Sequence, residues 1–176
     1  MASKIVVLDI ETTSLAADAG IVVGIGLMPE TGPAEYLPVK KTADEKKALT
    51  KLVSELEKYE VVVTWNGRGF DIPFLTTRLL SHGLDMRPLT SRRHIDLAEV
   101  VKGRLKLTFT YLDHVCDFLG IDRKEGAMGM DVPHLYLKAQ EGDAKARSVI
   151  REHCLDDLEA TRKVFLKLKP LLEGFL

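Results

Sequence analysis

The sequence has no excess of charge of either sign, because 25 Lys and Arg residues stand against 26 Asp and Glu residues and the formal net charge is −1. This balance excludes a global basic field that would attract nucleic acid, although it does not report on the charge of a single groove. Cysteine is also scarce, and the two cysteines, Cys116 and Cys154, match no metal-binding spacing. We therefore expect a reduced, cytoplasmic protein.

Long apolar runs are missing as well. Only four consecutive apolar residues precede Asp9, which is too few for a signal peptide, and no run approaches the length of a membrane span. The apolar content of 45% and the charged content of 29% are typical of a soluble globular protein. We therefore expect one domain over residues 1–176, with no membrane contact.

The periodicity of the apolar residues changes repeatedly along the chain. Strands are predicted from residue 5 through Glu11 and at 21–27, 35–39, 60–65 and 94–97. Short links between the first three strands indicate an antiparallel meander. A helical crossover then favours a fourth strand parallel to the first. The predicted fold class is α/β, with a mixed five-stranded sheet flanked by helices.

Several helices are predicted around these strands. Thr42 and Glu45 have the spacing of a capping box that opens a helix ending near Tyr59. A Gly-rich segment at 66–69 leads into another helix with Pro73 in its first turn. Further helices are expected at 111–119, 132–139 and 144–168, with a loop at 123–130.

Two carboxylates, Asp9 and Glu11, interrupt the apolar first strand. Residues two apart in a strand point to the same face, so both acids project into one small volume. Two anions there repel each other and lose hydration unless a cation compensates them. Taken alone, the pair is also compatible with a solvated strand end. More acids at the same point would favour a divalent cation.

Asp71 follows the fourth strand at the start of a helix, where Asp is often only an N-cap. If the first and fourth strands are neighbours, however, residues just beyond their ends converge, and Asp71 then faces Asp9 and Glu11. The sequence by itself leaves both interpretations open.

The last helix places two polar side chains on its inner stripe. At about 100° per residue, His153 and Asp157 share an arc with apolar residues, while most charged residues occupy the outer face. An acid on a core-facing stripe needs a partner. That partner is either the neighbouring His153, in a private pair, or a cation shared with the other acids.

Three segments, taken together and in their order along the chain, resemble the motifs of one protein family. They are residues 8–13 with Asp9 and Glu11, residues 64–75 with Asp71, and residues 153–161 with Asp157. This pattern resembles the DEDD family of 3′–5′ exonucleases in the ribonuclease-H-like superfamily. It is most similar to the exonuclease domain of family B DNA polymerases. There is one departure. The family has Tyr four residues before the last Asp or His five before it, whereas His153 stands four before Asp157.

The resemblance implies two Mg²⁺ or Mn²⁺ ions, which are hard cations that prefer oxygen ligands. Asp9 would bridge both ions, and Glu11 and Asp157 would lie on the side of the attacking water. Asp71 would act mainly through metal-bound waters, and His153 would orient or deprotonate the water. An unperturbed imidazole titrates near 6.5 and can serve as a base at neutral pH.

The resemblance also implies substrate contacts. The predicted contact residues are Thr12 at the terminal 3′-hydroxyl, Leu15 against the last base, and Asn66 and Phe70 along the strand-binding cleft. Basic side chains between residues 92 and 106 are either phosphate contacts or solvated surface, and Trp65 is either core packing or a base platform.

The predicted function is a 3′–5′ exonuclease that releases nucleoside monophosphates, with single-stranded 3′ ends of DNA as the preferred partner and RNA as a second one. The alternatives are a catalytically silent nucleic-acid-binding module and a metal-binding domain unrelated to nucleic acid.

Overall fold

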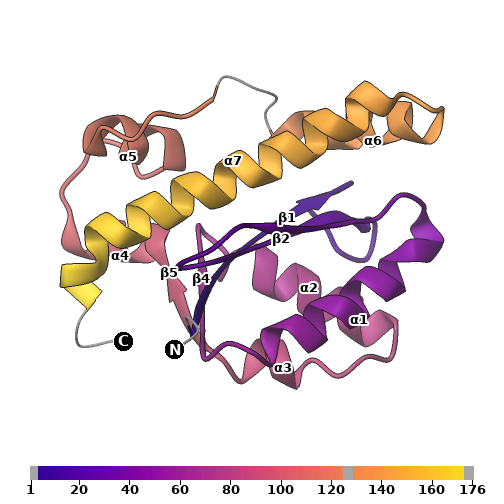
Figure 1. Ribbon diagram of the computed structural model, residues 1–176, viewed down its shortest axis with the longest axis horizontal. Helices are drawn as coiled ribbons and strands as arrows, with labels where there is room; N and C mark the ends of the chain where they lie inside the picture. Colours follow the sequence, from indigo (N-terminus) through magenta and orange to yellow (C-terminus); the bar gives the residue numbers. More distant parts are fainter. Residues whose placement is uncertain (1–3, 125–128, 173–176) are drawn as a thin grey trace.

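A five-stranded sheet lies between two layers of helices in the computed structural model of the protein, which describes residues 4–124 and 129–172 (Figure 1). The strands are β1 (Ile5–Thr12), β2 (Val22–Pro29), β3 (Glu35–Pro38), β4 (Val61–Thr64) and β5 (Arg93–Asp96). Their order in the sheet is β3-β2-β1-β4-β5. The pairs β1–β2 and β2–β3 are antiparallel, whereas β1–β4 and β4–β5 are parallel. The predicted mixed sheet is therefore confirmed.

The helices cover both faces of this sheet. They are α1 (Glu45–Leu56), α2 (Asp71–Ser81), α3 (Arg87–Thr90), α4 (Leu97–Arg104), α5 (Leu112–Leu119), α6 (Val132–Gln140) and α7 (Ala144–Leu168), with short 3-10 turns η1 (Thr42–Asp44), η2 (Gly129–Asp131) and η3 (Lys169–Leu172). Figure 1 shows α7 lying along one face, with α1, α2 and α3 on the other. The last three predicted helices agree with α5, α6 and α7 to within a residue at each end. Residues 125–128 of the predicted loop lie outside the described residues.

The two faces of β1 have different partners. Val6, Leu8 and Ile10 pack in the core formed with α1 and α2, whereas Val7 packs in the core formed with α4, α5 and α7. Because side chains alternate along a strand, Asp9 and Glu11 share the face of Val7. The central strand therefore points both acids toward α7.

Helix α7 approaches the sheet closely at a glycine. A Cβ atom added at Gly26 of β2 would lie 2.4 Å from Cδ1 of Leu158 and 2.6 Å from Sγ of Cys154. Gly26 pairs with Asp9 in the β1–β2 ladder. The missing side chain thus lets α7 pack directly over the strand position that carries the first acid.

The predicted capping box at Thr42 and Glu45 is wrong. Glu45 is fully buried, and its carboxylate accepts hydrogen bonds from the backbone N–H of Val22 (2.9 Å) and from Arg78 (2.7 and 2.9 Å). Arg78 donates to both oxygens of the Glu45 carboxylate, whereas a capping box offers a single N–H, so the tertiary partner prevails. Glu45 instead ties α1 to α2 and β2.

The fifth strand ends one residue earlier than predicted, at Asp96, and Leu97 begins α4. The carboxylate of Asp96 accepts from the backbone N–H of Ala98 (3.0 Å) and of Glu99 (3.5 Å). This N-cap makes the chain turn from strand to helix, which the apolar pattern alone did not reveal.

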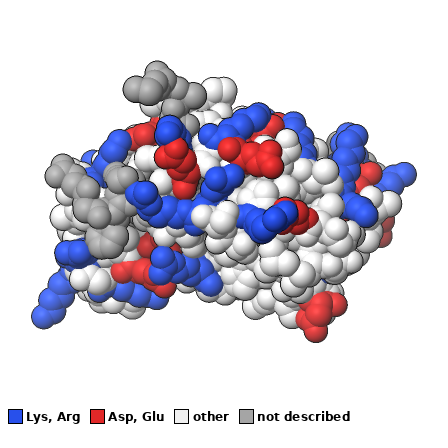
Figure 2. All heavy atoms as spheres, turned by 90° about the horizontal axis from the view of Figure 1, so that it is seen from below, with Lys and Arg blue, Asp and Glu red and all other residues white. Residues whose placement is uncertain are grey.

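The surface agrees with the near-neutral net charge. Figure 2 shows the face that α1, α2 and α3 cover, and basic and acidic side chains are interspersed on it. Within the part of the chain that the structure describes, no helix is long and apolar enough to cross a membrane.

Candidate active site

The end of β1 and the inner face of α7 bring acidic side chains together. Ligand atoms of Asp9, Glu11 and Cys154 all lie within 4.8 Å of one another. Asp157 and Asp71 are close enough that their charges raise the pKa of Asp9. The four acids predicted from the sequence therefore lie near enough for their charges to interact. The β1–β2 ladder shifts register directly after Glu11, as strands often do beside functional sites.

Asp9 is the acid whose charge is least compensated. Its Oδ2 atom is buried and has no hydrogen-bond partner among the described residues. Burial raises the pKa of Asp9 well above its usual range, and the charges of Asp157, Glu11 and Asp71 raise it further. The thiol of Cys154 donates the one side-chain hydrogen bond that opposes this rise. A buried carboxylate oxygen in this state is suited to a cation.

Glu11 is buried and pairs with the helix rather than with solvent. Nδ1 of His153 lies 2.7 Å from Oε1 of Glu11, whereas it lies 3.9 Å from Oδ2 of Asp157. Burial raises the pKa of Glu11, and the hydrogen bond from His153 opposes that rise. The same hydrogen bond raises the pKa of His153. The private His153–Asp157 pair is therefore not the principal contact, and Glu11 is the main partner of the histidine.

Asp157 has a cationic partner that the sequence did not reveal. The guanidinium of Arg123 contacts Asp157 and also bonds Oδ2 of Asp156 (3.0 Å) and Oδ1 of Asp113 (2.8 Å). Arg123 follows α5, and its side chain is only 19% exposed. This half-buried guanidinium neutralises part of the charge of the acidic cluster from the α5 side.

Asp71 is the first residue of α2 and is buried. Its burial raises the pKa of Asp71 to about 7, although the backbone N–H groups of Asp71 and Ile10 act in the opposite direction. Asp96 and Glu11 add to the rise through their negative charge. Phe70 occupies the N-cap position, so Asp71 is not a simple N-cap.

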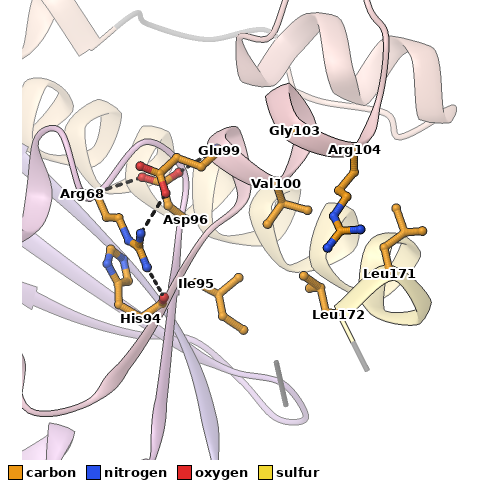
Figure 3. Close-up of a pocket in the computed structure, with 10 residues that line it drawn as sticks. All are labelled: Arg68, His94, Ile95, Asp96, Glu99, Val100, Gly103, Arg104, Leu171 and Leu172. Atoms are coloured by element: carbon orange, nitrogen blue, oxygen red, sulfur yellow. Dashed lines mark hydrogen bonds and ion pairs between the residues drawn. The ribbon is translucent and has the colours of Figure 1, made fainter. Parts of the chain in front are cut away.

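The loop between β4 and α2 is held by Asp96 and Arg68 (Figure 3). The Asp96 carboxylate accepts from the backbone N–H of Asn66 (2.9 Å) and of Arg68 (3.0 Å). The Arg68 side chain in turn donates to Glu99 and to the carbonyl of His94, both at 3.0 Å. These bonds hold the segment that leads into Asp71.

The predicted substrate contacts fall into separate places. Leu15 is 88% exposed and lines a hollow of about 210 Å³ together with Phe70. Asn66 has a left-handed backbone (φ 58°) and lines another cavity, of about 540 Å³. Thr12 is buried at the end of β1, and its hydroxyl donates to the carbonyl of Ser14 (2.8 Å).

The basic side chains that were considered for phosphate contacts are also dispersed. Lys102 lines the same cavity as Asn66, and Arg104 lines a different one. Arg93 pairs with Val61, which pairs with Ile5, at the end of the sheet away from the acids. Arg93 is therefore not placed to contact a substrate at the acidic cluster.

Sequence reasoning missed Cys154, Arg123 and Asp96. Cys154 is three residues before Asp157 on α7, so helical spacing could have placed it on the inner face. Burial and the neighbouring Asp9 raise the pKa of Cys154 well above its usual range, which favours the neutral thiol in the metal-free protein. No local pattern identifies Arg123, because its partners are remote in sequence. Asp96 has local N-cap partners in Ala98 and Glu99, but its bonds to Asn66 and Arg68 are remote and have no local signal.

Comparisons with known proteins point in one direction. The family model described as the RNase_H superfamily matches residues 6–169. A DNA polymerase of Methanocaldococcus jannaschii is 27% identical over 153 residues, which are 76% of this chain and 9% of the polymerase. An uncharacterized protein of the same organism is 31% identical over 166 residues, covering 90% of this chain and 92% of that protein.

A solved structure agrees with the sequence comparisons. The family B DNA polymerase of the hyperthermophilic archaeon Pyrobaculum calidifontis superimposes with a TM-score of 0.82 and 22% identity, over 96% of this chain and 25% of the polymerase. This match concerns the fold. Together with the family model, it confirms the predicted ribonuclease-H-like fold. The chain spans only a small part of either polymerase.

The raised pKa of Asp71 predicts a pH dependence of stability. An unfolded Asp titrates near 4, and Asp71 in the fold titrates at about 7. Between these values the folded state binds more protons, so the free energy of unfolding without metal decreases as pH rises from about 4 to about 7. We expect Asp71→Asn to remove part of this decrease in EDTA-treated protein, measured as urea midpoints from pH 4 to 8. Asp117→Asn, at an exposed position on α5, is the matched control, and its urea midpoints should follow those of the wild type. If the midpoints of Asp71→Asn fell with pH as steeply as those of the wild type, the prediction would be wrong.

Proposed function

The chain belongs to the RNase_H superfamily, and from this we propose that it is a metal-dependent nuclease that degrades nucleic acid from the 3′ end. It would release nucleoside monophosphates, with single-stranded DNA as the preferred substrate and RNA as the second. The observation that carries the proposal is the buried, unpartnered Oδ2 of Asp9 among three further acids. Such a cluster is costly for folding unless positive charge reaches it in the working protein.

The acids suit hard divalent cations. Asp9, Glu11, Asp71 and Asp157 offer carboxylate oxygens, which Mg²⁺ and Mn²⁺ prefer, whereas the neutral Cys154 thiol beside them is a poor ligand for such ions. In the proposal Asp9 would be the central ligand of two such ions, and Glu11, Asp157 and Asp71 would be the further residues that hold them. Two such ions, when bound, would activate a water and stabilise the leaving 3′ oxygen.

His153 is the proposed base. Glu11 engages Nδ1 of His153, so in the neutral tautomer that donates from Nδ1 the other nitrogen, Nε2, is the acceptor. A carboxylate on the far side of an imidazole fixes the tautomer and stabilises the imidazolium that forms on proton transfer. His153 would take the proton of the attacking water through Nε2.

The end of the strand would lie against the hollow between Leu15 and Phe70. The exposed Leu15 side chain is free to wedge against a terminal base, and Phe70 packs on Phe74 with ring centroids 5.5 Å apart. Thr12 is proposed to hold the 3′-hydroxyl through its backbone. Contacts of this kind tolerate any base sequence.

A catalytically silent module with the same fold is the second candidate function. The contact between Arg123 and Asp157 favours it, because an internal cation already balances part of the acidic charge. The two candidates differ in what the acids require: an enzyme must exchange this internal cation for metal, whereas a silent module has no need to.

Asp9→Ala tests the nuclease directly. We expect wild-type protein with Mn²⁺ to shorten 5′-labelled single-stranded DNA stepwise from the 3′ end, and Asp9→Ala to lose at least about a thousandfold in rate, because a shared ligand is gone. Denaturing gels and chromatography of the released monophosphates give the result. Asp117→Ala is the control that should retain activity. Internal cleavage, or wild-type activity in EDTA, would overturn the proposal.

The role of His153 is tested by comparing His153→Ala with His153→Tyr. We expect His153→Ala to lose about a hundredfold or more in kcat, as for removal of a general base. His153→Tyr should retain more activity at alkaline pH, because a phenol titrates near 10. The measurement is the pH profile of kcat, with Tm recorded for each variant. Full activity of His153→Ala across the pH range would make His153 purely structural.

Arg123→Gln separates the enzyme from the silent module without an activity assay. In the metal-free protein we expect a lower Tm, because three neighbouring acids lose their cation. We also expect Mn²⁺ to bind several-fold more tightly by calorimetry and to raise Tm by more than in the wild type, because the ion no longer displaces a guanidinium from Asp157. Arg87→Gln, at an exposed pair with Asp85, is the matched control. Unchanged Mn²⁺ affinity in Arg123→Gln would show that the two cations do not compete.

A further inference from the structure

A cavity of about 540 Å³ lies beside the acidic cluster and has no part in the chemistry proposed above. It is bounded by Trp65 and Asn66 after β4, by Lys102 of α4, and by the segment 108–111 before α5. Its volume falls in the range of about 300–1,000 Å³ that is usual for small-ligand pockets. We call it the aromatic pocket, after the residues described next.

Three rings cluster at the wall of the aromatic pocket. Phe109 and Tyr111 are 53% and 55% exposed, and their ring centroids lie 5.5 Å apart. The imidazole of His114 contacts both rings at 5.4 and 5.6 Å. Exposing two neighbouring aromatic side chains by more than half costs hydrophobic free energy, since each would gain from burial. The mutual ring contacts hold the rings in place while more than half of each of the two residues stays exposed.

The charge of the aromatic pocket suits an anionic strand. Among the described residues that line it, Lys102 is the one with a formal charge. Asp113, in the first turn of α5, is engaged by Arg123. Asn66, Thr108 and Thr110 add uncharged polar side chains to the lining. A cation, hydroxyls and open aromatic faces together match a nucleotide better than an apolar peptide.

The aromatic pocket is joined to the acidic cluster on two sides. The parallel register pairs Val7 with Val63, so Trp65 follows β4 at the level of Asp9 on β1. On the other side, Arg123 contacts both Asp157 and Asp113, which connects the first turn of α5 to the acids. A strand with its 3′ end at the acids would reach Phe109 and Tyr111 if it ran from the acids toward the first turn of α5.

We propose that the aromatic pocket binds an unpaired nucleobase of the strand whose 3′ end enters the acidic site, with the base stacked on Phe109 or Tyr111 and a phosphate at Lys102. This inference rests on the proposed function and extends it. It makes the protein selective for single strands, because bases in a duplex are paired and stacked and cannot lie on the rings.

The test is a double variant, Phe109→Ala with Tyr111→Ala, compared with Phe118→Ala. Phe118 is 61% exposed and lies on α5 but does not line the pocket, so it controls for the loss of an exposed ring. Binding is measured by fluorescence anisotropy, with Mn²⁺ and with single-stranded oligonucleotides whose phosphorothioate linkages resist cleavage. We expect the double variant to bind roughly tenfold more weakly, as for the loss of base–aromatic stacking, and Phe118→Ala to stay within about twofold.

An abasic scan locates the contact. Removing one base at each of the last six positions should weaken wild-type binding at one or two positions, and at those positions the double variant should show no further loss. Double-variant binding equal to that of Phe118→Ala, or a loss that is independent of the bases, would overturn the inference. Circular dichroism and Tm confirm that the variants fold.

A minimal substrate separates this inference from the nuclease proposal. The p-nitrophenyl ester of thymidine 5′-monophosphate reaches only the terminal site, so the double variant should hydrolyse it at the wild-type rate while losing about tenfold in kcat/KM on long strands. If neither protein hydrolyses anything but the binding difference remains, the nuclease proposal fails and the pocket stands. If hydrolysis is normal on both substrates, the pocket inference fails alone.

Discussion

Electrostatic repulsion between buried carboxylates is the constraint on which this molecule depends. Asp9, Glu11 and Asp71 carry pKa values raised by burial, and Asp157 adds its charge from α7. Within the described residues the compensation is incomplete: a thiol for Asp9, an imidazole for Glu11 and a guanidinium for Asp157. The Oδ2 atom of Asp9 receives none. The remaining demand for positive charge is the physical basis of the proposed metal site. The residues proposed to hold the metal are therefore also unfavourable for folding when no cation is bound.

The fold imposes this arrangement through its central strand. β1 pairs with both an antiparallel and a parallel neighbour, so its carboxyl end lies beside the start of α2 and beneath α7. Gly26 removes the side chain that would hold α7 away from β1, and Asp96 holds the loop that leads to Asp71. Neither residue is an acid of the cluster, yet both determine where those acids lie.

In the proposed function, substrate recognition depends on local surfaces and not on the net charge of the protein. The net charge is −1, and the face in Figure 2 mixes both signs. The Leu15–Phe70 hollow and the aromatic pocket instead offer apolar and aromatic surface on two sides of the loop between β4 and α2. Stacking of this kind is indifferent to base identity, which suits the proposed removal of nucleotides from any 3′ end. The related polymerases are far longer than this chain, and all four acids and His153 are nevertheless contributed by this chain.

Local periodicity was sufficient to predict much of the fold and the faces on which Asp9, Glu11 and Asp157 lie, whereas it left Asp71 open between an N-cap and a partner of these acids. A period of two placed Asp9 and Glu11 on one face of β1, and a period of 3.6 placed His153 and Asp157 on the inner stripe of α7. These are properties of single elements, so they can be read from neighbouring residues. Only the tertiary structure decided that His153 pairs with Glu11, that Arg123 neutralises Asp157, that Glu45 binds Arg78 instead of capping α1, and that Phe109 and Tyr111 flank a cavity beside Trp65. Each of these contacts joins side chains from different elements, and their distances depend on how closely the elements pack and not on any spacing along the chain.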